Sequence, residues 1–396
     1  MQQNQTPELD MPSANSTLPS NSHNNNDVAS GEHPQCILII RLSAIGDVVL
    51  ASGLLPALRA RYPNAKLSWL TEPATVPLLR GHPELEDILI WDKTGWKRRW
   101  KSGEKWAVIQ ELLNLRRKLK EAKFDWVLDT QGLLKSGIWA WFSGAKRRVG
   151  LGSKEGSHRL MTEVTPRDDA AVISSEYRGL IKYLGASDEF VERHYQMSLK
   201  QFSGGNPLHS EALSAFVKPI VKAPNLVTDT IQRQQYIVLC PFTTRPQKHW
   251  FDHHWIALEA LLQEHYQLPC IILGGPADKE TGAALAQKMQ NAVSLAGHSS
   301  LMDSNHIISE AAFLIGVDTG ITHMGIMHNV PTVAIFGSTC PYQIAPNTQV
   351  LYLNKSCSPC RRRPTCDGRF DCLLEITPEM VIAALSPLVS AQLPEK

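Results

Sequence analysis

The 396-residue sequence lacks several features that assign a chain to a class at once. It contains no apolar run of about eighteen residues or more, so we expect no transmembrane helix. It also contains neither a P-loop nor the helix motif of zinc metalloproteases. The net charge is only +2, so its sum identifies no class of partner, and its distribution along the chain is more informative.

The beginning of the chain has little from which a core could form. Residues 1–34 have neither the basic start nor the apolar stretch of a signal peptide. They are rich in Gln, Asn, Ser and Pro, a composition that cannot bury enough apolar surface to order itself. We therefore expect a disordered tail on a cytoplasmic protein.

The remaining chain has an ordinary composition and exceeds the length that one core usually supports, so two domains are expected. Short apolar runs predict strands at 37–40, 67–70, 88–91, 125–129, 236–240, 269–273, 293–295 and 312–317. Helices are expected between them, including 48–61 and 104–122. This alternation is typical of doubly wound α/β sheets. It weakens over 201–235, so we predict Rossmann-like domains at 35–200 and 236–396 joined by a connector at 201–235.

One strand–turn–helix segment carries a strong chemical signal. The apolar run 313–317 ends at Asp318, and Thr319 and Gly320 form a small-residue turn before a helix that includes His323. Free backbone N–H groups and the helix dipole attract an anion at such a position. The segment predicts a site for a phosphate-containing ligand at the carboxyl edge of a sheet.

Two further turns of the same half also follow predicted strands. Thr243, Thr244 and Lys248 come directly after the first strand of this half, and their hydroxyl and ammonium groups suit a pyrophosphate. Asp278 follows the next strand with a carboxylate that suits ribose hydroxyls. Ordinary turn chemistry explains any one of these loops. Because the carboxyl ends of parallel strands meet at one edge, the three loops together indicate a nucleotide site.

In the first half, Asp47 follows a glycine turn at the start of a predicted helix. Aspartate is a favoured N-cap residue, which is the structural explanation. The functional alternative is a general base that faces the crevice. The helix N-terminus would then hold the pKa of Asp47 down, so that the carboxylate accepts a proton at neutral pH. Asp129, Gln131 and Lys135 follow another strand and are expected to shape an acceptor site.

Basic residues gather in the first half, in the segments 93–105, 116–120 and 146–148. They would attract acidic lipid headgroups, phosphorylated saccharides or nucleic acid, and a solvated helix face is the alternative. Trp96 and Trp100 lie at helical spacing among these charges, which is typical of a segment that contacts a membrane surface. Packing of the tryptophans onto the domain core explains them equally well.

Four of the eight cysteines cluster near the C-terminus. Cys357, Cys360, Cys366 and Cys372 have a spacing compatible with a structural metal site. Separate reduced thiols are the alternative, because cytoplasmic proteins rarely keep stable disulfides.

Four segments together resemble the ADP-heptose–lipopolysaccharide heptosyltransferases, glycosyltransferase family nine, and among them the heptosyltransferase I type. The segments are 43–49 (Ser-Ala-Ile-Gly-Asp-Val-Val), 129–136 (Asp-Thr-Gln-Gly-Leu-Leu-Lys-Ser), 243–250 (Thr-Thr-Arg-Pro-Gln-Lys-His-Trp) and 317–323 (Val-Asp-Thr-Gly-Ile-Thr-His). The resemblance extends from about Ile37 to the C-terminal helix.

This resemblance implies a GT-B fold, with two Rossmann-like domains that face a central cleft. It implies an inverting glycosyltransferase that moves a heptose, or a related sugar, and needs no metal or other cofactor for catalysis. The donor would be an ADP-sugar held by the C-terminal half. The acceptor would be a Kdo-containing lipid A precursor held by the N-terminal half, in lipopolysaccharide core assembly. The protein would be cytoplasmic and attached peripherally to the inner face of the bacterial inner membrane, without a nucleic-acid partner.

By this resemblance Asp47 is the catalytic base and Lys248 stabilises the departing diphosphate. The donor-binding residues are Thr243, Thr244, Lys248, Asp278, Asp318, Thr319, Gly320 and His323. The residues assigned to the acceptor are Ser43, Gly46, Gln131, Lys135, Arg98, Arg99 and Arg148. Two alternatives remain: a nucleotide-sugar epimerase or hydrolase on the same framework, and a non-enzymatic module that binds through the cysteine cluster and its neighbouring arginines.

Overall fold

The computed structural model describes residues 33–199, 235–360 and 363–389. The predicted tail 1–34 and the predicted connector 201–235 lie almost entirely outside these residues. The described residues belong to one compact unit that begins at His33. The exact domain boundaries stay a prediction.

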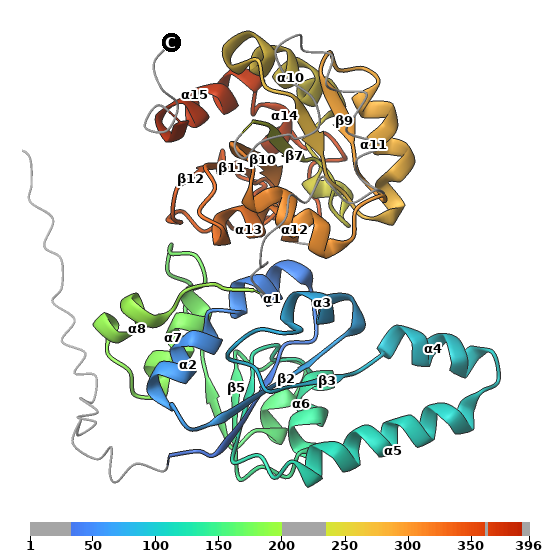
Figure 1. Cartoon of the computed structure of the whole chain (residues 1–396), viewed down its shortest axis with the longest axis vertical. Coiled ribbons are helices and arrows are strands. Elements are labelled where there is room, and N and C mark those ends of the chain that lie inside the picture. The colour runs from blue at the N-terminus through green and yellow to red at the C-terminus, as the bar shows by residue number, and fades with distance from the viewer. Residues whose placement is uncertain (1–32, 200–234, 361–362, 390–396) are drawn as a thin grey trace, which may run out of the picture. The chain divides into compact units, whose positions relative to one another are not determined.

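The first half forms a six-stranded parallel sheet, coloured blue to green in Figure 1. Its strands are β1 (Cys36–Ile40), β2 (Lys66–Thr71), β3 (Asp87–Ile90), β4 (Trp126–Asp129), β5 (Arg147–Leu151) and β6 (Glu163–Thr165). They are ordered β3-β2-β1-β4-β5-β6. The order reverses between β1 and β4, where Ile40 pairs with Asp129. That reversal creates the crevice in which doubly wound sheets bind ligands.

The second half repeats this arrangement. Its strands are β7 (Ile237–Cys240), β8 (Cys270–Ile272), β9 (Ala292–Ser294), β10 (Phe313–Val317), β11 (Thr332–Ile335) and β12 (Thr348–Leu351). They are ordered β12-β11-β10-β7-β8-β9, again all parallel, with the reversal between β7 and β10. The predicted doubly wound α/β architecture is confirmed.

The apolar runs of the central strands are continuous because helices cover both faces of each sheet. In β1, Ile37 and Ile39 enter one buried cluster, whereas Leu38 and Ile40 enter the cluster on the other face. The helices of the first half are α1 (Ile45–Ala51), α2 (Leu54–Arg61), α3 (Val76–Leu79), α4 (Lys93–Lys101), α5 (Lys105–Glu121), α6 (Leu134–Phe142), α7 (Ser175–Tyr183) and α8 (Asp188–His194), with 3-10 turns η1 (Pro73–Thr75) and η2 (Ser157–Leu160).

The predicted helix 48–61 is in fact two helices, because α1 ends at Ala51 and α2 begins at Leu54. Pro56 lies in the first turn of α2, where the missing N–H of proline costs no helical hydrogen bond. In the second half, the helices are α10 (Asp252–Tyr266), α11 (Lys279–Ala286), α12 (Leu301–Ser309), α13 (Gly320–Met327), α14 (Asp371–Leu374) and α15 (Pro378–Val389), with 3-10 turns η4 (Pro246–Lys248) and η5 (Pro276–Asp278). None of the helices in the described residues combines the length and apolarity that a membrane span requires.

The two halves meet through α1 and α13. Val49 of α1 and Leu78 of α3 share one buried apolar cluster with Val238 and Leu314 of the second sheet. Away from this cluster, Val172 forms a parallel bridge with Ile344. The contact between α1 and α13 places the starts of these two helices against each other, at the residues where the sequence predicts the chemistry.

Candidate active site

Asp47 is the third residue of α1, not its N-cap. Its Oδ2 accepts a hydrogen bond of 3.0 Å from the backbone N–H of Ala44, the N-cap residue. This bond satisfies one of the free N–H groups at the helix start. The side chain remains 42% exposed, so the carboxylate stays accessible to a ligand while the turn holds its position.

Arg41 is the partner that sequence reasoning missed. It follows β1 directly and is buried, with its Nη2 2.5 Å from Asp47 Oδ2 and its Nη1 donating to the carbonyl of Thr130 at 2.7 Å. A cation rarely enters a core unless it is paired. The signal was therefore present in the sequence, as an arginine that ends an otherwise apolar strand.

The surroundings of Asp47 keep its carboxylate ionised. Burial opposes ionisation, but Arg41, the N–H of Ala44 and His323 together outweigh it and hold the pKa of Asp47 below its usual value. The predicted direction of the shift is thus correct. A buried guanidinium is a principal cause of it, in addition to the helix start that we had expected to act alone.

The loop after β4 braces the loop that carries Asp47. Gln131 Oε1 accepts hydrogen bonds from the backbone N–H groups of Leu42 at 3.0 Å and Ser43 at 3.3 Å. Asp129 is fully buried and accepts from the N–H groups of Gln131 and Gly132, both at 3.1 Å, so it shapes its own turn. Burial raises the pKa of Asp129 to about 6. Through its two hydrogen bonds to the backbone of Leu42 and Ser43, Gln131 fixes the position of the loop that precedes Asp47.

The basic residues assigned to the acceptor differ in their surroundings. Lys135 Nζ lies 3.8 Å from Glu72 Oε1, and burial, followed by the field of Lys93, lowers the pKa of Lys135. Arg99 forms two hydrogen bonds with Glu111, of 2.5 and 2.6 Å. The guanidinium of Arg148 donates to the carbonyls of Leu160 and Ala145, whereas Arg98 is exposed on α4. Their role in acceptor binding stays a prediction.

Asp318 is the centre of the second cluster, directly after β10. Its Oδ2 forms an ion pair with Lys248 of η4 and accepts a hydrogen bond of 2.5 Å from Thr339 Oγ1. Next to it, α13 begins at Gly320 with Thr319 as an extended N-cap residue. The side chain of Thr319 makes no capping hydrogen bond in the described structure, so the first N–H groups of α13 are available to an anion.

His323 completes this cluster one turn into α13. Its Nε2 lies 3.7 Å from Asp318 Oδ1, and its Nδ1 lies 3.2 Å from the hydroxyl of Tyr342. Burial lowers the pKa of His323, against the opposing fields of Asp318 and Asp47. The imidazole is therefore neutral at neutral pH and acts as a hydrogen-bonding group rather than a cation.

The remaining donor-site candidates lie on two neighbouring turns. Thr243 accepts a hydrogen bond of 2.8 Å from His249 through its carbonyl, and the side chain of Thr244 is exposed. Asp278 Oδ2 accepts from the N–H of Gly275 at 2.8 Å, so one of its oxygens stabilises η5. A Cβ placed on Gly274 would contact both Phe242 and Asp278, which shows that the two turns are adjacent.

The two clusters adjoin through a pair of glycines. A Cβ placed on Gly46 would lie 2.7 Å from His323 Cδ2 and 3.1 Å from the Cα of Gly320. A Cβ placed on Gly320 would lie 2.8 Å from the backbone nitrogen of Gly46. Only residues without a side chain allow this approach, and it brings Asp47 next to the loop of Asp318, Thr319 and His323.

The cysteine cluster gives the metal interpretation no support. Cys366 and Cys372 are buried, Cys357 and Cys360 are half-buried, and none of the four forms a disulfide. Burial and the three neighbouring cysteines raise the pKa of the Cys372 thiol to about 11. Among the described residues, no three or more His, Cys, Asp or Glu side chains are arranged to hold a metal ion.

Two Rossmann-like sheets with polar loops at their reversal points define the class of protein, a GT-B type α/β fold. Residues 112–369 match the model of glycosyltransferase family 9 (heptosyltransferase). The chain therefore belongs to glycosyltransferase family 9 and is a glycosyltransferase of the heptosyltransferase kind. The predicted family is confirmed over the epimerase, hydrolase and binding-module alternatives.

Individual relatives agree with this assignment. The chain is 26% identical over 305 residues to lipopolysaccharide heptosyltransferase 1 of Escherichia coli (strain K12), covering 77% of this chain and 88% of the relative. It is also 26% identical over 365 residues to lipopolysaccharide heptosyltransferase 2 of the same strain, covering 89% and 98%. The solved structure of E. coli heptosyltransferase WaaC with ADP-2-deoxy-2-fluoro heptose shares the fold, with a TM-score of 0.64, 21% identity and coverage of 88% and 98%.

Proposed function

We propose that this protein transfers a heptose from ADP-heptose to a Kdo-containing lipid A precursor during assembly of the lipopolysaccharide core. The observation that carries the proposal is the contact between the starts of α1 and α13, which sets an ionised Asp47 beside the loop of Asp318 and His323. A base on one half and an anion site on the other are the two parts that sugar transfer requires. The names of the relatives supply the identity of the sugar and its nucleotide.

The donor half holds the ADP-sugar. The diphosphate is received by the first N–H groups of α13 and by the ammonium group of Lys248. Asp278 and Thr243 lie on the two adjacent turns and contact the ribose and the phosphates. The pair between Lys248 and Asp318 keeps the ammonium group in place before the ligand arrives.

Transfer is a single displacement at the anomeric carbon. Asp47 takes the proton from the acceptor hydroxyl, whose oxygen attacks the face of the heptose opposite the diphosphate. The bond between the anomeric carbon and the phosphate oxygen breaks, and ADP leaves with the electron pair. Lys248 and the start of α13 stabilise the negative charge that develops on ADP, a contribution that is often the largest in catalysis. The configuration at the anomeric carbon is inverted.

The acceptor half holds an anionic glycolipid. Gln131 and Ser43 shape the wall beside Asp47, and Lys135, with Arg98, Arg99 and Arg148, receives carboxylates and phosphates of the acceptor. Because the acceptor is a lipid, the enzyme works as a cytoplasmic protein at the inner face of the inner membrane.

The test offers the full-length protein a panel of ADP-, UDP- and GDP-sugars, with Kdo-lipid A or lipid A without Kdo. Mass spectrometry should detect one added heptose only with ADP-heptose and only on the Kdo-containing lipid. Transfer of heptose to lipid A without Kdo would overturn the acceptor assignment. Consumption of ADP-heptose at the same rate without any acceptor would overturn transfer itself in favour of hydrolysis.

A further inference from the structure

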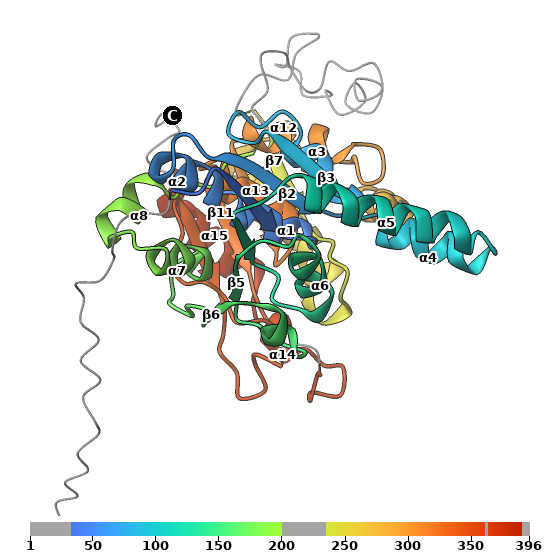
Figure 2. The ribbon, with the colours of Figure 1, turned by 90° about the horizontal axis from the view of Figure 1, so that it is seen from below.

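Helices α4 and α5 form a hairpin that both ribbon views show extending beyond the strands of the first sheet (Figures 1 and 2). One side of α5 belongs to the core, since Val108, Leu115 and Leu119 are buried. Helical spacing places them on a single face. A surface helix with one buried face normally presents a polar face opposite to it.

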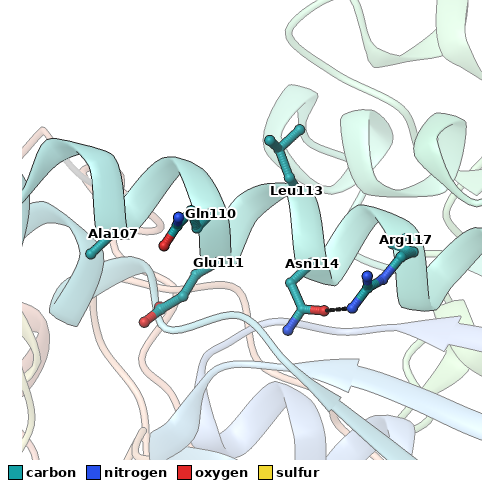
Figure 3. A pocket seen from close by; sticks show the side chains of 6 residues that line it. All are labelled: Ala107, Gln110, Glu111, Leu113, Asn114 and Arg117. Atoms are coloured by element: carbon teal, nitrogen blue, oxygen red, sulfur yellow. Dashed lines mark hydrogen bonds between the residues drawn. The ribbon is translucent and has the colours of Figure 1, made fainter.

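The opposite face of α5 carries exposed apolar residues among its polar ones. Trp106, Ile109 and Leu113 recur at spacings of three and four residues, so they form a second stripe. Trp106 is 71% exposed and Leu113 is 51% exposed. In Figure 3, which shows the shallow groove along α5, Leu113 points away from Glu111 and Asn114. Arg117 and Lys120 continue the face of this second stripe and are exposed.

The end of α4 adds a second exposed indole. Trp100 is 46% exposed, and Lys105 Nζ lies 5.9 Å from the centroid of its ring. Trp96 is different, because it is buried with its ring 6.2 Å from that of Trp139 in α6. Core packing, one of the two interpretations, therefore applies to Trp96. The exposed Trp100 is available to contact another surface.

The charge of the hairpin complements an anionic surface. Residues 93–121 contain ten Lys and Arg and three Glu, a net charge of +7, whereas the whole chain carries only +2. Two of the basic residues are paired within the hairpin, Arg99 with Glu111 and Arg117 with Glu121. Lys97, Lys101 and Lys105 are exposed close to the two indoles.

The neighbouring helix α6 also has exposed apolar residues, and they begin near the candidate active site. Leu134, Ile138 and Trp141 of α6 are exposed and lie at spacings of four and three residues. The helices are in contact, with the Arg116 guanidinium 5.3 Å from the ring centroid of Phe142. Because α6 begins at Leu134, this surface starts two residues after Gly132, at the end of the loop that braces Ser43.

We propose that the hairpin surface, made of Trp100, Trp106, Ile109 and Leu113 with its surrounding lysines, seats the protein on an anionic phospholipid bilayer. Tryptophan prefers the depth of the lipid headgroups, and lysines beside it meet their phosphates. The occupant is the bilayer itself and not the phosphates of the acceptor. The choice of a lipid surface rests on the proposed function, in which the acceptor is membrane-embedded, and seating the hairpin holds the crevice close to that acceptor.

The experiment measures sedimentation of the full-length protein with vesicles that contain no acceptor. Binding is expected with phosphatidylglycerol vesicles and should fall sharply with phosphatidylcholine alone. Trp100→Ser/Trp106→Ser should weaken binding about tenfold or more. Lys97→Glu/Lys101→Glu/Lys105→Glu should weaken it about a hundredfold or more, since each of the three cations near the surface contributes about a fivefold factor. The control variants change exposed side chains elsewhere: Val164→Ser/Leu374→Ser for the indoles and Lys66→Glu/Lys288→Glu for the charges.

The outcomes separate docking from catalysis. With detergent-dispersed acceptor, Trp100→Ser/Trp106→Ser should transfer heptose at the wild-type rate, which also shows that the variant is folded. Unchanged vesicle binding by both hairpin variants, or an equal loss in the controls, would overturn the proposal. A wild-type dimer in light scattering that the tryptophan variant dissociates would overturn it in favour of a second copy of the chain. Vesicle binding without any transfer would refute the proposed function and leave the docking surface standing.

Discussion

The guanidinium of Arg41 lies 2.5 Å from the carboxylate of Asp47, and the arginine is almost completely buried while the aspartate is not. This asymmetry assigns the two residues different tasks. Arg41 is held by the carbonyl of Thr130 and cannot reach a ligand, so it acts as a positioning residue. Asp47 presents an oriented and ionised oxygen to whatever enters the crevice.

Replacing Asp47 by asparagine should lower kcat about 10²- to 10⁴-fold, the usual contribution of a positioned base. The affinity for ADP should change little, because the base acts only in the chemical step. Single-turnover kinetics and calorimetry measure the two quantities. Asp87→Asn, at an exposed position of β3 in the same half, is the matched control. Near-normal transfer by the Asp47→Asn protein would remove Asp47 from this role.

Arg41→Met should shift the acidic limb of the kcat–pH profile to higher pH. Transfer needs ionised Asp47, and Arg41 is the largest of the groups that lower the pKa of that carboxylate. In the wild type, activity and the stabilising charge pair are therefore lost together as pH falls through the depressed pKa. Arg41→Lys keeps a positive charge and should retain more of the wild-type profile. If Arg41→Met lowered the folded fraction but left the limb in place, the arginine would be only structural.

Lys248→Ala should weaken ADP binding about ten- to a hundredfold, because a hydrogen bond to a charged group contributes about 1.5–3 kcal/mol. The variant also leaves Asp318 without its cation. Adding Asp318→Asn should therefore recover part of the loss. Calorimetric titration with ADP measures both, with exposed Lys288→Ala as the control. Equal ADP affinity in Lys248→Ala and the control would contradict the assignment.

Gly320→Ala should reduce kcat by up to about a hundredfold, the effect expected of a displacement near one ångström. The new methyl group would lie 2.8 Å from the backbone nitrogen of Gly46, so the starts of α1 and α13 must separate. At Gly275 the nearest atom to a new Cβ is 3.6 Å away, so Gly275→Ala is the steric control. Tm and kcat are measured for both variants. A fully active Gly320→Ala protein would show that the close approach is not needed for transfer.

Much of the architecture was readable from the sequence because parallel sheets obey simple geometric rules. The apolar runs around Ile37 and Phe313 had to be buried strands, and polar residues after such strands had to gather at one edge. This reasoning placed Asp47, Asp318 and Lys248 in one region without any knowledge of their contacts. It also gave the right expectation for the ionisation of Asp47.

Contacts between residues far apart in the sequence could not be predicted from it. Lys248 and Asp318 each looked like a ligand-binding residue, and nothing local indicates that they pair across seventy positions. Asp129 looked equally exposed to a ligand, but its oxygens are used by its own turn. Helical spacing grouped Trp96 with Trp100, although only packing against Trp139 decides which of the two is buried.

The close approach of α1 and α13 has an electrostatic consequence. Both helices meet by their first turns, so the partial positive charges of two helix starts are brought together. Asp47 offsets this charge for α1, whereas the first turn of α13 contains no acidic residue. A diphosphate bound there would relieve the repulsion and tie the two sheets to one another. ADP should therefore raise the Tm of the protein far more than adenosine does, because only ADP carries the diphosphate that binds between the two helix starts.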